Sequence, residues 1–218
     1  RWTHLATIVF QNSSLNSMAC AHFLLDTGGH FEIHLISKSF EIGLMGETPG
    51  LLGATGWPKV RPHWLSEGGL DTPTEESTAV RASWLAKSMA ISLSDRGASF
   101  HTGSRVISDD KEGRALRISV PGEEGSAEIQ YDVFVGSEKS PEAVVWKGAV
   151  TLSPPETTPM SGRRPDGTYE SWWRGEGEPR NPLQLMTWEG EDPSSALDES
   201  IGEASRASDN ILSGSLPA

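Results

Sequence analysis

One stretch near the N-terminus, residues 5–39, constrains the fold of this chain more than any other. It opens with an apolar, β-branched run over 5–10. Small and apolar residues then recur at helical spacing over 17–25, the Thr27-Gly28-Gly29 sequence ends that helix, and residues 31–36 alternate as in a strand. Two strands joined by a helix of this length predict a βαβ unit with parallel strands and a right-handed crossover.

The turn before this helix lacks the glycines of a dinucleotide-binding motif. That motif reads G-x-G-x-x-G, with an acidic residue about 20 positions further on. When the motif is aligned on the helix sequence AHFLL, Asn12, Ser14 and Ser17 take the places of the three glycines. Ser37 takes the place of the acid at the end of the second strand. The helix start still offers N–H groups and the positive end of a dipole, as an anion-binding site does. The side chains around it differ from those of the dinucleotide-binding motif.

Glycine and proline interrupt the next segment, residues 40–73, which we expect to be a long irregular loop. Two interpretations stay open: a functional loop folded over a site, or a surface excursion pinned by Trp57 and Trp64. A helix with one apolar face follows over 75–97, and Asp71, Thr72 or Thr74 is a suitable N-cap residue.

The second half of the chain has the pattern of strands separated by turns. We expect a strand over 98–107, a hairpin of 114–120 with 127–130, and a short apolar strand over 131–135. Three further strands and a terminal helix are predicted at 144–152, 168–174, 183–188 and 194–211. The fold class is therefore α/β: a Rossmann-like FAD/NAD(P)-binding fold with an attached antiparallel β-sheet section. The predicted domains are 1–140 and 141–218.

Charge and cysteine content exclude several classes of function. The formal net charge of the 218 residues is −12, which argues against nucleic acid or an anionic membrane surface as the main partner. No apolar run reaches transmembrane length. Cys20 is the single cysteine, so no intrachain disulfide forms, and a cytoplasmic location is expected. No histidine pair stands with carboxylates at metal-ligand spacing, and no metal site is predicted.

Three segments together resemble the FAD-dependent oxidoreductases that include aromatic-ring hydroxylases and geranylgeranyl reductases. The first is the βαβ unit from AHFLL into its second strand. The second, TAVRASWLAKSMAISLSDRGASFHTGSRVI, is similar to a segment in which an arginine opens a helix near the flavin, and the match implies that role for Arg81. The third, YDVFVGSEKS, looks like a strand ending in a Gly-Ala-Asp-Gly turn, and Gly136 and Ser140 match it.

The chain departs from that family at two places. The first turn has no glycine, and the family's later Gly-Asp motif is not found, which predicts either a diverged, truncated relative or a fragment. Within the resemblance, the residues expected to bind FAD are Asn12, Ser14, Ser17, Ser37, Arg81 and Gly136.

Two functions follow from these observations, and both stay open at this point. In the first, the chain is an FAD-dependent oxidoreductase or monooxygenase whose flavin supplies the redox chemistry, and a small-molecule substrate reaches it past the 40–73 loop. In the second, the chain is a relative that has lost FAD and acts as a binding or assembly module for a partner protein.

Overall fold

The computed structural model describes residues 5–43, 48–67, 71–122, 125–136, 143–156 and 160–214. Contacts between Cα atoms group the chain into two compact units, each made of separate segments. The first unit contains 1–42, 89–138 and 201–218, and the second contains 43–88 and 139–200. The domain boundary predicted between residues 140 and 141 stays a prediction.

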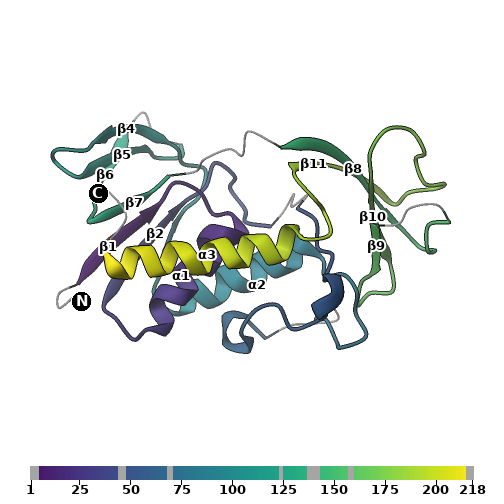
Figure 1. The fold of residues 1–218 in the computed structure, drawn as a ribbon. Helices are drawn as coiled ribbons and strands as arrows, with labels where there is room; N and C mark the ends of the chain where they lie inside the picture. The colour runs from purple at the N-terminus through teal and green to yellow at the C-terminus, as the bar shows by residue number, and fades with distance from the viewer. Residues whose placement is uncertain are drawn as a thin grey trace. The chain divides into compact units, whose positions relative to one another are not determined.

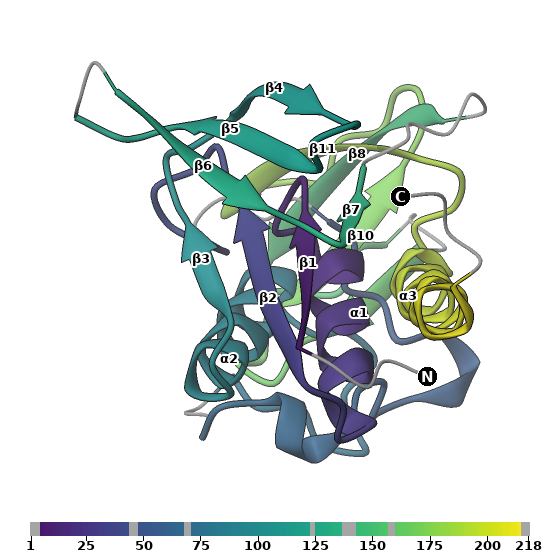
Figure 2. The same cartoon turned by 90° about the vertical axis from the view of Figure 1, so that its left-hand side faces the viewer.

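A four-stranded parallel sheet forms the centre of the first unit. Its order is β3-β2-β1-β7, and every neighbouring pair is parallel. The strands are β1 (Ala6–Phe10), β2 (Phe31–Ile36), β3 (Ser99–His101) and β7 (Val133–Val135), and helix α1 (Leu15–Asp26) connects the first two. Figure 2 shows the four strands side by side, with α1 packed beside β1. The predicted βαβ unit is confirmed, with a helix three residues longer than its sequence pattern indicated (12 residues against 9).

Both faces of this sheet are covered, as parallel sheets require. Ile8, Val9 and Phe10 are consecutive in β1 and each is fully buried, so side chains pointing to opposite faces both reach a core. On the face that carries Val9 and Ile36, a second sheet packs with Leu116 and Ile118. This antiparallel sheet consists of β4 (Val106–Asp110), β5 (Ala115–Ser119) and β6 (Ser126–Gln130) in that order.

The antiparallel sheet changes one of the predicted strands. The predicted hairpin of 114–120 with 127–130 is confirmed as β5 and β6. The predicted strand over 98–107 is wrong, because the chain turns at Thr102–Gly103 and leaves the parallel sheet. Gly103 has a φ of 64°, which side chains with a Cβ rarely adopt, and β4 then pairs with β5.

Helix α2 (Ala82–Asp95) begins seven residues later than predicted, so the proposed N-caps before it are wrong. Its end is tied to α1 by a polar chain inside the first unit. Arg96 donates from Nη1 to His22 Nδ1 at 2.8 Å and from Nη2 to Asp26 Oδ1 at 2.7 Å. A guanidinium only donates, so His22 accepts at Nδ1 and donates its Nε2–H to the carbonyl of Met89 at 3.1 Å. The fully buried His22 is therefore a structural residue.

The second unit is built on the antiparallel sheet β11-β8-β10-β9. Its strands are β8 (Val144–Thr151), β9 (Met160–Arg163), β10 (Tyr169–Trp173) and β11 (Gln184–Gly190), as drawn in Figure 1. One face packs Trp146, Val150, Trp172 and Met186 against Leu51 and Ala79. This sheet confirms the predicted antiparallel section.

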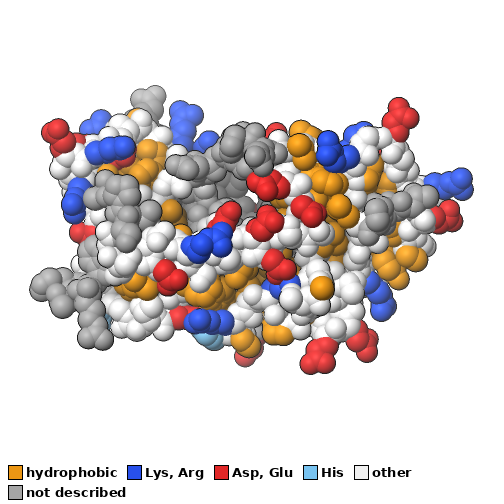
Figure 3. All heavy atoms as spheres, in the orientation of Figure 1, with side chains coloured by type: hydrophobic (Ala, Val, Ile, Leu, Met, Phe, Trp, Pro, Cys, Tyr) orange, Lys and Arg blue, Asp and Glu red, His pale blue; other side chains and the backbone are white. Residues whose placement is uncertain are grey.

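Apolar side chains also reach the surface of the second unit. Val145, Leu183 and Leu185 are 53–59% exposed, and Figure 3 shows hydrophobic side chains over β8 and β11. Trp172 and Trp173 are adjacent in β10, and both are buried, at 1% and 9% exposed.

Two 3₁₀ turns, η1 (Gly53–Thr55) and η2 (Pro62–Trp64), interrupt the long loop of the second unit. Helix α3 (Ala196–Ser213) begins with Asp198 and Glu199 in its first turn, where acidic side chains suit the helix dipole. No helix in the described ranges combines the length and apolar character needed to cross a bilayer.

Tyr131 offers a test of the packing between the two sheets of the first unit. Burial, followed by its 2.7 Å hydrogen bond to Asp109 Oδ1, raises the pKa of Tyr131 from 10.0 to about 12. The unfolded chain releases this proton near pH 10 and the folded chain holds it, so stability should fall as the pH rises from 10 through 12. Urea unfolding at several pH values measures this fall.

Tyr131→Phe should lose about 1 kcal/mol at neutral pH, because the hydroxyl–carboxylate hydrogen bond is removed. The same variant should have a shallower loss of stability above pH 10. Tyr169→Phe is the matched control, since it leaves the Tyr131–Asp109 contact intact. If the unfolding free energies of Tyr131→Phe and the unmodified protein depend on pH in the same way, Tyr131 is not the group responsible for the loss of stability above pH 10.

Candidate functional site

The three residues that replace the glycines form a closed hydrogen-bond network at the start of α1. Ser14 is the N-cap, and its Oγ accepts from the Ser17 backbone N–H at 3.2 Å and donates to Ser17 Oγ at 3.1 Å. Asn12 Oδ1 accepts from the Ser14 backbone N–H at 2.9 Å and from Ser17 Oγ at 2.7 Å. Side chains of the turn itself therefore satisfy groups that a helix start usually leaves open.

This network uses the donors that an anion would need. The backbone N–H groups of Ser14 and Ser17 both donate to side chains of the turn. Within the described part of the chain, the N–H groups of Leu15 and Asn16 donate to no protein acceptor. The helix start thus keeps two free donors beside two that are already occupied.

Ser37 and Gly136 lie at the same edge of the parallel sheet as this turn. Ser37 follows β2, is 7% exposed, and is held by backbone hydrogen bonds to His101 (2.9 Å) and Ser104 (2.8 Å). Gly136 follows β7, and a Cβ added to it would lie 3.6 Å from Gln11 Oε1, next to the Asn12 turn. The carboxyl ends of β1, β2 and β7 meet here, which is where open α/β sheets bind ligands.

Arg81 belongs to the second unit and is engaged by acidic residues of that unit. Its half-exposed side chain places Nη1 3.8 Å from Asp71 Oδ2. It also acts on Asp166: burial raises the pKa of Asp166, but hydrogen bonds from Thr168 and the charges of Arg164 and Arg81 outweigh burial and lower it. Asp71 and Asp166 are therefore the anionic neighbours of Arg81 in its own unit.

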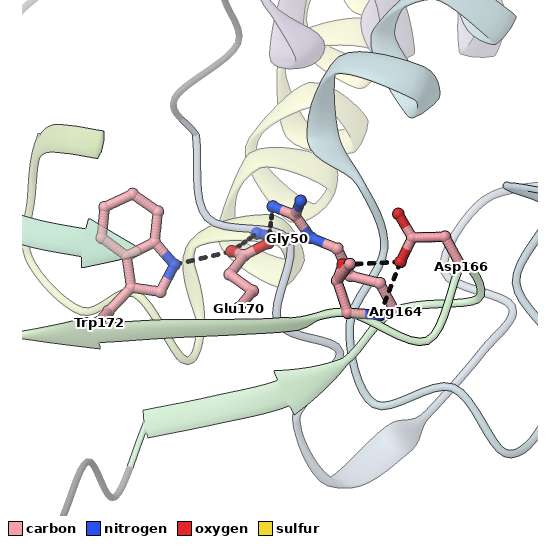
Figure 4. Close-up of polar contacts among 6 residues, drawn as sticks. Gly50, Arg164, Asp166, Glu170 and Trp172 are labelled. Carbon is pink, nitrogen blue, oxygen red and sulfur yellow. Dashed lines mark hydrogen bonds and ion pairs between the residues drawn. The ribbon is translucent and has the colours of Figure 1, made fainter. Parts of the chain in front are cut away.

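A buried ion pair in the second unit was not predicted from the sequence. Glu170 is fully buried and Arg164 is 7% exposed. Arg164 donates to Glu170 Oε2 from Nε at 3.0 Å and from Nη2 at 2.6 Å. Glu170 Oε1 accepts from the Gly50 backbone N–H and from Trp172 Nε1, both at 2.7 Å, as Figure 4 shows.

This ion pair is structural rather than catalytic. Both carboxylate oxygens of Glu170 are occupied by protein donors, so no position is left for a substrate proton. Position 50 must be glycine for its backbone to lie this close to Val80, because a Cβ there would lie 1.9 Å from the carbonyl oxygen of Val80. The only sequence signal for this pair is recognisable in retrospect. Glu170 is the one charged residue in the strand YESWW, whose residues 171–173 are also buried.

A histidine pair occupies the sheet face of the first unit. His34 Nδ1 lies 2.9 Å from His101 Nε2, and the rings stack with centroids 5.2 Å apart. Burial, then the neighbouring His34, lowers the pKa of His101. Across the described ranges, no group of three or more His, Cys, Asp or Glu side chains is arranged to hold a metal ion.

Burial raises the pKa of the Cys20 thiol to about 12, which keeps it protonated and unreactive.

The fold matches solved flavoproteins at low sequence identity. A flavoprotein/dehydrogenase from Cytophaga hutchinsonii is 11% identical with a TM-score of 0.63, over 96% of this chain and 79% of that one. A geranylgeranyl bacteriochlorophyll reductase-like protein from Thermoplasma acidophilum is 12% identical with a TM-score of 0.56, over 97% and 80%. The chain has the fold of flavoprotein hydroxylases and reductases. The resemblance stated from the sequence is confirmed at the level of the fold.

The OxyS anhydrotetracycline hydroxylase from Streptomyces rimosus is 12% identical with a TM-score of 0.54, and this chain spans 64% of its length. No protein-family model and no curated protein sequence matches the chain. The fold is thus shared, while the activity of those longer proteins is not thereby assigned to this one.

The residues at the α1 turn do not fit the FAD pyrophosphate that this fold would place there. Glycines let the backbone approach the phosphates and leave the N–H groups free. Here side chains stand at all three positions, and two of the N–H groups are already bonded to them. Ser37 also lacks the carboxylate that would accept the ribose hydroxyls.

Glu170→Gln tests the structural role of the buried ion pair. The amide NH₂ of glutamine would face either Arg164 or the Gly50 and Trp172 donors, so one set of donors loses its acceptor. We expect a loss of about 3 kcal/mol in unfolding free energy, measured by denaturant titration. Glu178→Gln, an exposed glutamate of the same unit, should change it by less than about 0.5 kcal/mol. A loss below about 1 kcal/mol for Glu170→Gln would contradict the role.

Proposed function

We propose that this chain is a non-catalytic member of the flavoprotein fold that does not hold FAD at the α1 turn and acts as a binding module. The observation that carries the proposal is the closed Asn12–Ser14–Ser17 network. Its side chains take the place of the ligand oxygens that glycine-rich turns bind through their backbone. The helix is capped by the protein, so the N–H groups of Ser14 and Ser17 need no cofactor as a partner.

Two further observations support the proposal. The titratable groups that are buried and paired, His22 with Arg96 and Glu170 with Arg164, have structural partners and leave no open position for a reacting atom. The exposed aliphatic side chains on β8 and β11 are of the kind that contact partner molecules. Binding of a small molecule or of a partner protein is compatible with both.

The second candidate function is an FAD-dependent oxidoreductase or monooxygenase. The fold and the free N–H groups of Leu15 and Asn16 favour it, because two donors and the positive end of the α1 dipole remain at the sheet edge. In that case FAD would contact the edge formed by Asn12, Ser37 and Gly136, and the flavin would supply the redox chemistry.

FAD titration separates the two functions. The freshly purified protein should be colourless, and flavin fluorescence should show no saturable quenching with FAD up to about 50 μM, well above the micromolar affinity of a resident cofactor. A yellow protein, or one-to-one quenching at micromolar FAD, would sink the proposal and restore the oxidoreductase.

A triple variant tests whether the side chains themselves close the site. In Asn12→Gly/Ser14→Gly/Ser17→Gly the N–H groups of the turn lose their internal acceptors. We expect FAD affinity to rise at least tenfold over the unmodified protein, with some loss of helix stability from the missing cap. Ser13→Gly, a neighbour outside the Asn12–Ser14–Ser17 network, is the control and should leave FAD affinity unchanged.

A further inference from the structure

The long loop of the second unit and Trp84 of α2 line an open cavity that shares no lining residue with the α1 turn. The cavity has a volume of about 370 Å³. Most of its lining is apolar, with two tryptophans and two prolines, and three polar residues complete it. The lining residues are Trp57, Pro58, Val60, Pro62, Leu65, Ser66, Glu67, Thr72 and Trp84. This size and composition are typical of small-molecule pockets.

Polar contacts hold the loop in place on both sides of the cavity. Lys59 Nζ lies 2.6 Å from Asp198 Oδ1 and also bonds Thr55, and the lysine side chain is only 5% exposed. On the other side, the Ser66 backbone N–H donates to the Ser88 carbonyl at 3.2 Å, and the two serine hydroxyls lie 3.1 Å apart. The cavity walls are therefore preformed, which lowers the entropy cost of binding.

The loop also packs its own apolar residue away from the cavity. Trp64 is 1% exposed, and the Arg61 guanidinium lies 5.6 Å from its ring centroid. Trp57 and Trp84, by contrast, are only partly buried and line the open space. Two partly exposed indoles facing an unfilled apolar space provide flat surfaces on which an aromatic ring can stack.

Charge at the cavity is negative and uncompensated. Glu67 is exposed and makes no ion pair with any residue that the structure describes. The cations of the same loop are engaged elsewhere, Lys59 with Asp198 and Arg61 with Trp64. An ammonium group would be attracted by Glu67, by the tryptophan faces and by the net charge of −12.

We infer that this cavity binds a planar aromatic molecule that carries a protonated amine. The ring lies between the Trp57 and Trp84 side chains, and the ammonium group meets Glu67 at the edge. The inference names a ligand class for the proposed binding module, but it rests on residues of the second unit alone. It therefore stands or falls separately from the absence of FAD at α1.

Tryptamine is a suitable probe, studied with the full chain by isothermal titration calorimetry and ligand-detected saturation-transfer NMR. We expect saturable one-to-one binding with a Kd of about 0.1–1 mM, from the ligand efficiency of small ligands. Indole-3-propionate has a similar ring system with the opposite charge, and it should bind at least about tenfold more weakly because it meets the Glu67 carboxylate.

Glu67→Gln assigns the binding to the cavity. This variant should weaken the binding of tryptamine about three- to fivefold, the range of a solvent-exposed ion pair. It should also reduce the difference in affinity between tryptamine and indole-3-propionate. Glu76→Gln, an exposed glutamate outside the lining, should leave both affinities unchanged. No saturable tryptamine binding up to about 5 mM, equal affinity for the two probes, or equal effects of the two variants would overturn the inference. FAD titration of the same samples reports on α1 independently.

Discussion

The structure depends first on the need of buried or helix-terminal polar groups to find a partner. A helix start exposes N–H groups that must be satisfied by water, a ligand or a side chain. In glycine-rich dinucleotide sites the ligand supplies the acceptors. Here Asn12 and Ser14 supply them from within the turn. The N–H groups of such a turn can therefore bond to a nucleotide or to side chains of the turn, and in this chain those of Ser14 and Ser17 bond to side chains.

In the second unit, a buried charge also needs hydrogen-bond partners. Glu170 is fully buried, and an unpaired carboxylate there would be costly. Arg164, Trp172 and the Gly50 backbone together supply four hydrogen bonds. Because Gly50 lies in the long loop, the carboxylate fastens that loop to β10, and the loop in turn forms the walls of the Trp57–Trp84 cavity.

Where sequence reasoning went wrong, tertiary contacts were the cause. The apolar period over 75–97 suggested an early helix start, but residues 78–80 are not helical, and Ala79 forms an isolated bridge with Leu51. Thr78 and Ala79 donate to the Arg163 carbonyl, and Val80 donates to Gly50. These hydrogen bonds join positions more than 25 residues apart, so no local pattern reveals them.

The sequence by itself determined the βαβ unit, the β5–β6 hairpin and the antiparallel section, because periodicity, glycine and turn residues act locally. It also placed Asn12, Ser14 and Ser17 at the turn where glycines were expected. Only the tertiary structure decided that these side chains bond to one another, that Glu170 finds Arg164, and that the loop leaves a cavity beside Trp84. Those outcomes depend on distances between residues far apart in the chain, and packing alone sets such distances.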